Sequence, residues 1–317
     1  MRPLRHQFIW PVLGVTVLAL LAMSLVPVIV IVQKGGGAFT AGWSPSRKEQ
    51  GVDAYRGLGA WVDLWDARAW RAPAATVSDM NSHGVNTIYI ETATAKSATG
   101  LVNPSALRTF ITEAHARHMY VVAWYFPSMK PGSVDYGRVV QTVEFKTGDG
   151  QRFDSVALDI ESSDVKPFGA RNRGLAALSR MIRNRVGPSY PLGAIIPPPV
   201  GLEKKTGFWD IFPYATVAES YDVILPMAYY TYHVHTAAQT RADVIANMRL
   251  LRAQPGCSKI PVHLIGGIAG SSSSAEVRQF ARAARTTGCI GASLYDWVGT
   301  NDAKWRELEA VWAARAR

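Results

Sequence analysis

The sequence predicts a (β/α)8 TIM barrel preceded by one N-terminal transmembrane helix. From residue 56 to residue 317, short apolar runs rich in β-formers alternate with longer segments of helical periodicity. This alternation is typical of repeated βα units on a parallel sheet. The number of units and the length of about 260 residues match the usual size of a (β/α)8 barrel. A long uncharged stretch from Phe8 to Val32 comes before them.

This uncharged stretch is long enough to cross a bilayer. About 25 residues at ~1.5 Å each exceed the ~30 Å hydrocarbon thickness. A cleaved signal peptide has an apolar region of only about 7–15 residues, so an uncleaved signal anchor is expected, with cleavage near "AFTAG" left open. The predicted segments are a short cytoplasmic tail at 1–7, the anchor at 8–32, a flexible linker at 33–55 and the barrel at 56–317.

The basic balance of the chain favours polyanions, but its distribution argues against nucleic acid. The formal net charge is +10 and the pI is about 9.7. These values suit anionic lipid or an acidic cell-wall polymer. The charges are spread along predicted helices such as 171–185 instead of forming a basic run, so no nucleic-acid partner is expected. With two cysteines and no CxxC or CxxH pair, neither a metal nor a cofactor is expected.

Eight strands and at least five helices can be placed along the barrel region. The strands are expected at 58–63, 87–91, 119–126, 155–161, 192–196, 223–229, 261–265 and 291–295. The clearest helices are 105–117, 173–186, 237–253, 274–287 and 302–314, and Gly187, Gly256 and Gly288 stand at their C-terminal ends. An open doubly wound sheet is the alternative. It is disfavoured because "WVDLWDARAW", and not a glycine-rich phosphate loop, follows the first strand.

The cysteines bear on the compartment. Cys257 and Cys289 lie just before the seventh and eighth strands, at the bottom rim of neighbouring strands. A disulfide there would imply an oxidising compartment. The alternative, two unpaired buried thiols, would give no indication of the compartment. The positive charges on the two sides of the span are nearly balanced, so they do not decide its orientation. We expect a single-pass protein of the cell membrane with its barrel outside the cytoplasm.

The fourth strand carries the strongest chemical signal. In "FDSVALDIES", apolar residues alternate with Ser155, Ala157, Asp159 and Glu161. The second set points into the barrel, which places Asp159 and Glu161 at the C-terminal mouth where barrel active sites lie. Two close carboxylates do not ionise independently, and the one whose pKa is raised suits a general acid. The alternative is that both carboxylates only bind loop amides or basic side chains.

This strand resembles the DGxDxDxE signature of family 18 glycoside hydrolases, the chitinase family. Asp154, Asp159 and Glu161 match its first and third aspartates and its catalytic glutamate. Ser155 replaces the glycine and Ala157 replaces the middle aspartate.

Two further strands are similar to the same family. Met227 and Tyr229 in "YDVILPMAYYTY" match its Met-x-Tyr element. Tyr295 in "GASLYDW" stands where the family has a floor tryptophan.

The resemblance implies hydrolysis of a glycan that contains N-acetylated sugars, such as chitin or peptidoglycan. Glu161 would then protonate the leaving oxygen, while the acetamido group of the substrate attacks the anomeric carbon. Asp159 and Tyr229 would orient that group, so no second protein nucleophile is needed. A mechanism with a nucleophilic glutamate on strand seven is disfavoured, because "HLIGGIAG" contains no acid.

Other polar and aromatic residues at strand ends extend the candidate site. Flat rings with polar edges suit the faces of pyranose rings, although any one of them can instead be core. His233 and His235 lack a matched third ligand, and a loop role is expected for them. The expected substrate-binding residues are Asp63, Trp65, Glu91, Trp124, Tyr125, Met227, Tyr230, Tyr295, Asp296 and Trp297.

Two alternatives to this function stay open. "LDIE" also resembles the Asp-x-Glu element of family 25 lysozymes, which have a further aspartate on the first strand, where Asp63 stands. A catalytically inactive barrel that binds glycan or a partner protein at the cell surface is the second alternative, and Ala157 favours it. Retention of Asp159, Glu161 and Tyr229 favours the enzyme.

Overall fold

The computed structural model describes residues 52–204 and 207–312. The predicted tail at 1–7, the anchor at 8–32 and nearly all of the linker at 33–55 lie outside the described residues. Within the described ranges, no helix is both long enough and apolar enough to cross a membrane.

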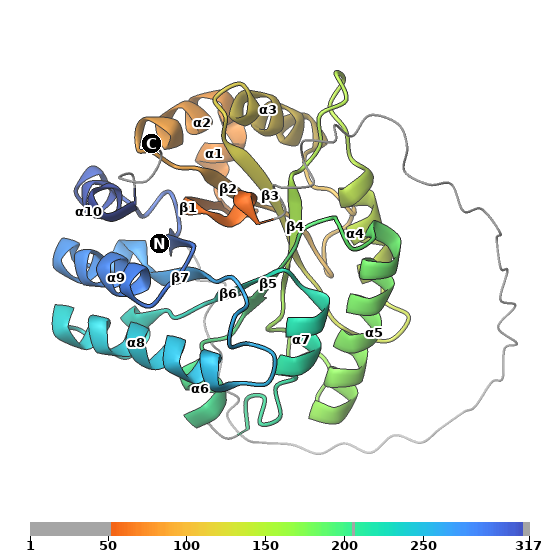
Figure 1. Ribbon diagram of the computed structural model, residues 1–317. Coiled ribbons are helices and arrows are strands. Elements are labelled where there is room, and N and C mark those ends of the chain that lie inside the picture. Colours follow the sequence, from red (N-terminus) through yellow and green to blue (C-terminus); the bar gives the residue numbers. More distant parts are fainter. Residues whose placement is uncertain (1–51, 205–206, 313–317) are drawn as a thin grey trace, which may run out of the picture. The chain divides into compact units, whose positions relative to one another are not determined.

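The described residues form an eight-stranded parallel sheet in which every strand is followed by at least one helix or helical turn. Its order is β6-β5-β4-β3-β2-β1-β8-β7, and bridges from Ile224 to Val262 and from Met227 to Ile265 join the two ends. The (β/α)8 barrel predicted from the sequence is confirmed. Figure 1 shows the strands at the centre, with α2, α3, α5, α8, α9 and α10 around them. The strands are β1 (Gly57–Val62), β2 (Thr87–Thr94), β3 (Tyr120–Phe126), β4 (Ser155–Asp159), β5 (Leu192–Ile196), β6 (Val223–Pro226), β7 (His263–Ile268) and β8 (Gly291–Tyr295).

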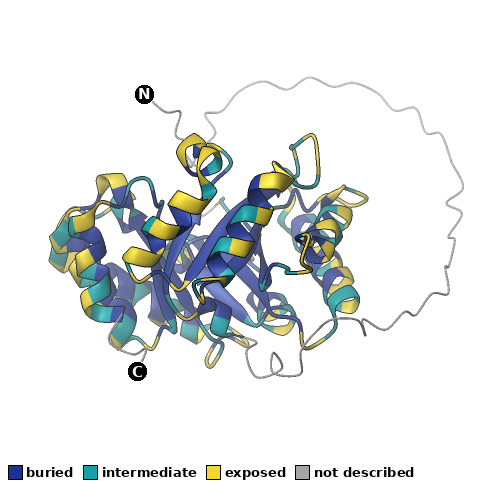
Figure 2. Ribbon diagram, turned by 90° about the horizontal axis from the view of Figure 1, so that it is seen from above, coloured by how far each residue is buried: buried dark blue, intermediate teal, exposed yellow. Residues whose placement is uncertain are grey.

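The helices close the outside of the sheet. They bury one face each and expose the other, as the colours of Figure 2 show. Local signals explain their ends: Ser273 and Glu276 form a capping box at the start of α9, and Gly187 ends α5 with a φ of 77° that favours glycine. The helices are α1 (Ala67–Arg71), α2 (Pro73–Ser82), α3 (Pro104–His115), α4 (Asp135–Glu144), α5 (Phe168–Val186), α6 (Pro199–Lys204), α7 (Tyr214–Ser220), α8 (Ala237–Ala253), α9 (Ser274–Thr286) and α10 (Asp302–Trp312).

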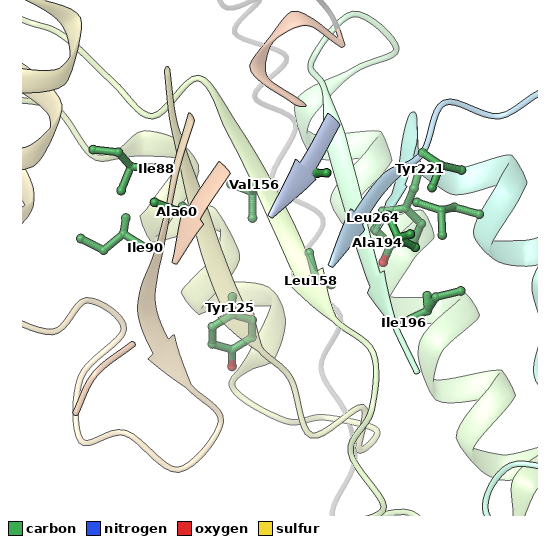
Figure 3. Packing of buried hydrophobic residues seen from close by; sticks show 14 of the residues in the cluster. Ala60, Ile88, Ile90, Tyr125, Val156, Leu158, Ala194, Ile196, Tyr221 and Leu264 are labelled. Carbon is green, nitrogen blue, oxygen red and sulfur yellow. The ribbon is translucent and has the colours of Figure 1, made fainter. Parts of the chain in front are cut away.

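The helix-facing side chains of the strands form one continuous apolar core. Val156 and Leu158 of β4 belong to it, together with Ile88 and Ile90 of β2. Figure 3 shows these residues with their neighbours on the other strands. Because side chains alternate along a strand, this packing turns Ser155, Ala157 and Asp159 into the barrel, as the sequence predicts.

The disulfide considered for Cys257 and Cys289 is not formed, and the alternative of two buried thiols holds. Cys257 and Cys289 are both free and buried. The Cys257 thiol lies 3.6 Å from the Pro255 carbonyl oxygen, whereas the Cys289 sulfur lies 3.7 Å from the Met248 sulfur of α8. Each thiol is therefore packed into its own part of the helix–sheet core, and burial raises the pKa of both thiols, to about 11 and about 12. The cysteines give no support for an oxidising compartment.

The bottom of the barrel is filled by Tyr55, which precedes β1. Its hydroxyl group bonds to the Ser155 hydroxyl at 2.5 Å. A Cβ atom on Gly193 of β5 would lie 2.6 Å from the Tyr55 hydroxyl oxygen, so only glycine leaves room for this plug. Asp154, just before β4, has a structural role: its carboxylate accepts from the Val121 N–H and contacts His115 Nε2, both at 2.8 Å.

A buried histidine lies above this plug. His263 Nδ1 is 2.9 Å from the Tyr55 carbonyl oxygen, and its Nε2 is 3.0 Å from the Ser293 hydroxyl. A carbonyl only accepts, so Nδ1 carries the proton and Nε2 accepts from Ser293. Burial without a charged partner in these contacts lowers the pKa of His263 to about 4.

This histidine should make the barrel acid-sensitive. Because the folded-state pKa is about 4 and the usual value is 6.5, the unfolded chain binds the extra proton between these pH values. The stability is therefore fully present above pH 6.5 and should fall by about 3 kcal/mol as the pH drops to about 4. We expect His263→Gln to remove this part of the pH dependence of the unfolding free energy, measured by urea denaturation at several pH values. The exposed His235→Gln should keep it. Parallel curves for wild type and His263→Gln would contradict the assignment.

Candidate active site

The mouth of the barrel has a floor of stacked aromatic rings. Trp61 of β1 and Tyr89 of β2 stack at 4.3 Å between ring centroids, and Trp61 meets Trp124 of β3 edge to face at 5.4 Å. All three are nearly or fully buried. Trp61 Nε1 donates to Ser293 at 2.8 Å, and the Tyr89 hydroxyl lies 3.1 Å from His263 Nδ1. The floor is therefore a packed layer whose polar atoms are already used within the barrel.

Asp159 stands on this floor at the end of β4. Its side chain is buried, and its Oδ2 accepts a hydrogen bond of 3.1 Å from Trp124 Nε1. Ala157, one step deeper, is paired in register with Trp124 on one side and Gly193 on the other. A carboxylate at position 157 would be buried among rings whose N–H and O–H groups bind elsewhere. The indole of Trp124, and not a second aspartate, supports Asp159 here.

Glu161 lies two residues further, in the turn that follows β4, and it is only partly buried. β4 ends at Asp159, two residues earlier than the sequence predicts, because the backbone turns after the N–H of Ile160 bonds the Ile195 carbonyl at 2.8 Å. Glu161 thus sits above Asp159 at the rim. A carboxyl group that reaches both solvent and the mouth is suited to exchange a proton with a bound molecule.

Tyr229, which follows β6, lies within reach of both carboxylates. Its pKa is raised well above the usual value, first by burial and then by the charges of Glu161 and Asp159. Both carboxylates therefore lie within electrostatic reach of the same phenol, which stays protonated and can donate a hydrogen bond. Tyr229 holds a left-handed backbone with φ 38°, a conformation that costs a non-glycine residue about 1–2 kcal/mol. Its N–H is fixed on the Gly266 carbonyl at 3.0 Å.

Tyr295 of β8 completes the ring around the mouth. Its hydroxyl donates to Asp63 Oδ2 at 2.7 Å, and its ring lies 6.2 Å from Tyr229 and 6.1 Å from Trp124. Burial raises the pKa of Tyr295, followed by the charge of Asp63. The other Asp63 oxygen accepts from the Trp65 N–H at 2.7 Å. Both oxygens of this carboxylate are thereby engaged in holding the loop after β1.

The other acids of the candidate set also reach this region. Glu91 of β2 is buried, and its Oε2 accepts from the Leu64 N–H at 3.0 Å. Its charge contributes to the raised pKa of Tyr295. Asp296 accepts from the Gly299 N–H at 2.8 Å, and its charge acts on Tyr229. Both acids therefore lie within electrostatic reach of the tyrosines at the mouth.

Three aromatic residues of the candidate set face away from the mouth. The Tyr125 hydroxyl donates to Asp135 of α4 at 2.7 Å, and Figure 3 shows its ring among the helix-facing apolar side chains. Tyr230 donates to Ser272 at 2.9 Å and packs near Phe280 of α9. Trp297 donates to Asp79 of α2 at 2.8 Å. All three belong to the buried apolar core between strands and helices, so the structure corrects their assignment as substrate-binding residues.

Two other candidates are placed differently. Met227 is almost fully buried and alternates with the helix-facing Ile224 and Ala228, which places it inside the barrel. Trp65 is 52% exposed in the loop after β1. An exposed tryptophan at the mouth offers an apolar face to a ligand.

The structure adds residues that the candidate set lacks. Tyr89, His263 and Ser293 support the floor, and their inward positions follow from strand alternation once the register is known. Tyr232, 48% exposed, packs edge to face on Tyr229 at 5.8 Å. The sequence signal that could have identified Tyr232 is its position three residues after Tyr229. His233, expected in a loop role, contacts Asp243 of α8 at 2.6 Å.

Within the described residues, no group of three or more histidine, cysteine, aspartate or glutamate side chains could hold a metal ion.

Several glycoside hydrolases of known structure share this architecture. The spore cortex-lytic enzyme SleL of Bacillus cereus superposes with a TM-score of 0.59 at 10% identity, over 81% of this chain and 74% of that one. A chitinase from Chromobacterium violaceum gives 0.57 at 12% identity, over 83% and 100%. A family 18 chitinase from Cycas revoluta, in complex with allosamidin, gives 0.58 at 11% identity, over 81% and 99%.

The described domain has a family 18-like barrel fold. No protein-family model matches the sequence, and no curated protein does. An endo-β-1,4-mannanase from Thermotoga petrophila also superposes on this family 18-like barrel, with a TM-score of 0.59 at 11% identity, over 83% of this chain and 78% of that one. The likeness therefore concerns the fold, and the chemistry has to come from the residues of the mouth.

The bond between Tyr295 and Asp63 should stabilise the mouth. Tyr295→Phe removes one donor from an almost fully buried carboxylate, which should lower the unfolding free energy by about 1–3 kcal/mol in denaturant titration. Tyr136→Phe, at a partly buried position on α4, is the matched control and should change it little. Equal unfolding free energies for wild type and Tyr295→Phe would mean that Asp63 does not depend on this donor.

Proposed function

We propose that this protein is a membrane-anchored, extracytoplasmic glycoside hydrolase that acts on glycan containing N-acetylated sugars, with Glu161 as the general acid. The observation that carries the proposal is the convergence of Glu161, Asp159 and Tyr229. The charges of both carboxylates act on the same buried phenol at the mouth of a family 18-like barrel. These are the three residues that match the catalytic elements of that family in the sequence.

The geometry supports a division of roles. Glu161 is the more exposed carboxyl group, so it can meet the glycosidic oxygen and donate a proton to it. Asp159 is buried and held by the Trp124 indole, and Tyr229 is a fixed donor. In the proposed reaction these two hold the acetamido group while its carbonyl oxygen attacks the anomeric carbon. Water then opens the resulting ring and returns a proton to Glu161.

The loss of the middle aspartate at Ala157 does not by itself argue for an inactive barrel. Trp124 Nε1 already supplies a donor to Asp159 from the neighbouring strand. The muramidase alternative would need Asp63 as a working carboxylate. Both Asp63 oxygens instead accept hydrogen bonds, from Tyr295 and from the Trp65 N–H. The structure therefore favours the mechanism that uses the substrate's own acetamido group.

Replacing the proposed acid tests the mechanism. Glu161→Gln keeps the shape of the side chain but removes its proton, so hydrolysis of chitin oligosaccharides or peptidoglycan should fall about 10²–10⁴-fold with glycan binding retained. Asp159→Asn should also lower turnover. Glu91→Gln is the matched control and should do much less, because Glu91 is engaged with the Leu64 N–H.

The outcomes separate the hypotheses. New reducing ends report hydrolysis, and isothermal titration reports binding. Loss of turnover in Glu91→Gln with full activity in Glu161→Gln would show that the acid is misassigned. A wild-type protein that binds these glycans without cleaving them would be the inactive, glycan-binding barrel.

The proposed membrane topology makes a separate prediction. Protease added to intact cells should digest the barrel and leave a small protected N-terminal piece, detected with an antibody against an N-terminal tag. Cells opened with detergent are the control, in which this piece should lose its protection. A barrel that survives in intact cells but not in opened ones would lie on the cytoplasmic side, and cell-wall glycan could not be its substrate.

A further inference from the structure

Tyr232 is a large aromatic side chain at the mouth that the proposed mechanism does not use. It lies on the short 3-10 helix Tyr230–Tyr232 that follows β6. Its side chain is 48% exposed, whereas Tyr229, three residues earlier, is buried. The two rings meet edge to face, with centroids 5.8 Å apart and planes at 78°. One face of the site is therefore lined by two tyrosines three residues apart, one deep and one at the rim.

The backbone that carries Tyr232 is held from several sides. The Tyr232 N–H donates to the Tyr229 carbonyl at 3.1 Å, and the Thr231 hydroxyl accepts from the Ile268 N–H of β7 at 3.0 Å. His233 Nε2 contacts the buried Asp243 of α8 at 2.6 Å. An exposed ring on a loop fixed in this way loses little conformational freedom when a ligand covers it.

The position of Tyr232 relative to the two carboxylates indicates which way a bound glycan extends from the floor of the site. The pKa of Tyr232 is raised by burial and by the charge of Glu161. That of Tyr229 is raised by burial and by both Glu161 and Asp159. Tyr229 also lies 6.2 Å from Tyr295, whose ring meets the floor residue Trp124 at 6.1 Å. From the floor outwards, the order is therefore Tyr295, Tyr229 and Tyr232, with Glu161 beside the outer two.

We propose that Tyr232 is a stacking platform for the sugar on the leaving-group side of the bond that is cleaved. This inference rests on the proposed function. The sugar whose anomeric carbon reacts lies deep, against Tyr229 and Tyr295, and Glu161 must reach the oxygen that joins it to the next residue. The next residue then lies on the outer side of Glu161, where Tyr232 presents its ring. The preferred substrate is accordingly a glycan with a sugar, and not a small group, on both sides of the bond.

A pair of substrates that differ only in the leaving group tests this platform. With full-length protein, chitotetraose has a sugar leaving group, whereas chitobiosyl fluoride releases a single fluoride ion. Tyr232→Ala should raise KM for chitotetraose about threefold to tenfold, relative to any change for the fluoride, since an aromatic contact of this kind is lost. Tyr232→Trp should restore the wild-type ratio. Met181→Ala on α5, where Met181 is 47% exposed, is the control and should leave both substrates unaffected.

The outcomes distinguish this inference from the proposed function. Equal losses on both substrates in Tyr232→Ala would mean that the ring only supports Tyr229, and no loss on either would exclude a contact; both results overturn the platform. If wild-type protein cleaves neither substrate, the hydrolase proposal fails. Isothermal titration of chitotetraose into wild type and Tyr232→Ala then tests whether Tyr232 binds the sugar. Equal affinities of the two proteins would overturn the platform.

Discussion

The filling of the barrel interior is the constraint on which the site depends. Eight parallel strands enclose a space that side chains must occupy without leaving buried polar atoms unsatisfied. Here large aromatic rings fill it: Trp61 and Tyr89 stack, and Trp124 meets Trp61 edge to face. The polar edges of these rings then require partners within the barrel. Ser293, His263 and Asp159 supply them, so the packing of the core also positions a carboxylate of the mouth.

This arrangement explains how the mouth tolerates the alanine at position 157. An aspartate there would enter a buried layer in which the nearby donors are already bound, and its charge would be costly. The support for Asp159 comes from the side, through the Trp124 indole. Acidic side chains gather around Tyr229 and Tyr295, whose raised pKa values keep both phenols neutral. In the proposed mechanism, Tyr229 is a neutral donor that orients a polar sugar substituent without neutralising the acid that transfers the proton, whereas the Tyr295 hydroxyl is engaged with Asp63.

The site also divides into a rigid interior and a rim open to solvent. Asp159 and Tyr229 are buried, while Glu161 is partly exposed and Trp65 and Tyr232 are exposed. The loops that carry the rim residues are tied to the barrel: Asp63 bonds the Trp65 N–H, and Asp243 holds His233. In the proposed mechanism, Glu161 at the boundary between these two zones reaches the glycosidic oxygen while the reacting sugar is shielded from water.

The sequence by itself determined the strand-and-helix alternation, the barrel and the inward face of β4, because the periodicity of apolar residues reports which side of each element is buried. It also singled out Asp159, Glu161 and Tyr229. Whether an aromatic residue near a strand end faces the mouth or the helices was decided only by the tertiary structure. Tyr125 lies on β3 next to Trp124, and a shift of one position reverses the side. Tyr230 and Trp297 follow the ends of β6 and β8, where the turns of the backbone set their direction. The pairing of Cys257 and Cys289 depended in the same way on side-chain direction, since proximity of two strands does not bring two sulfur atoms together.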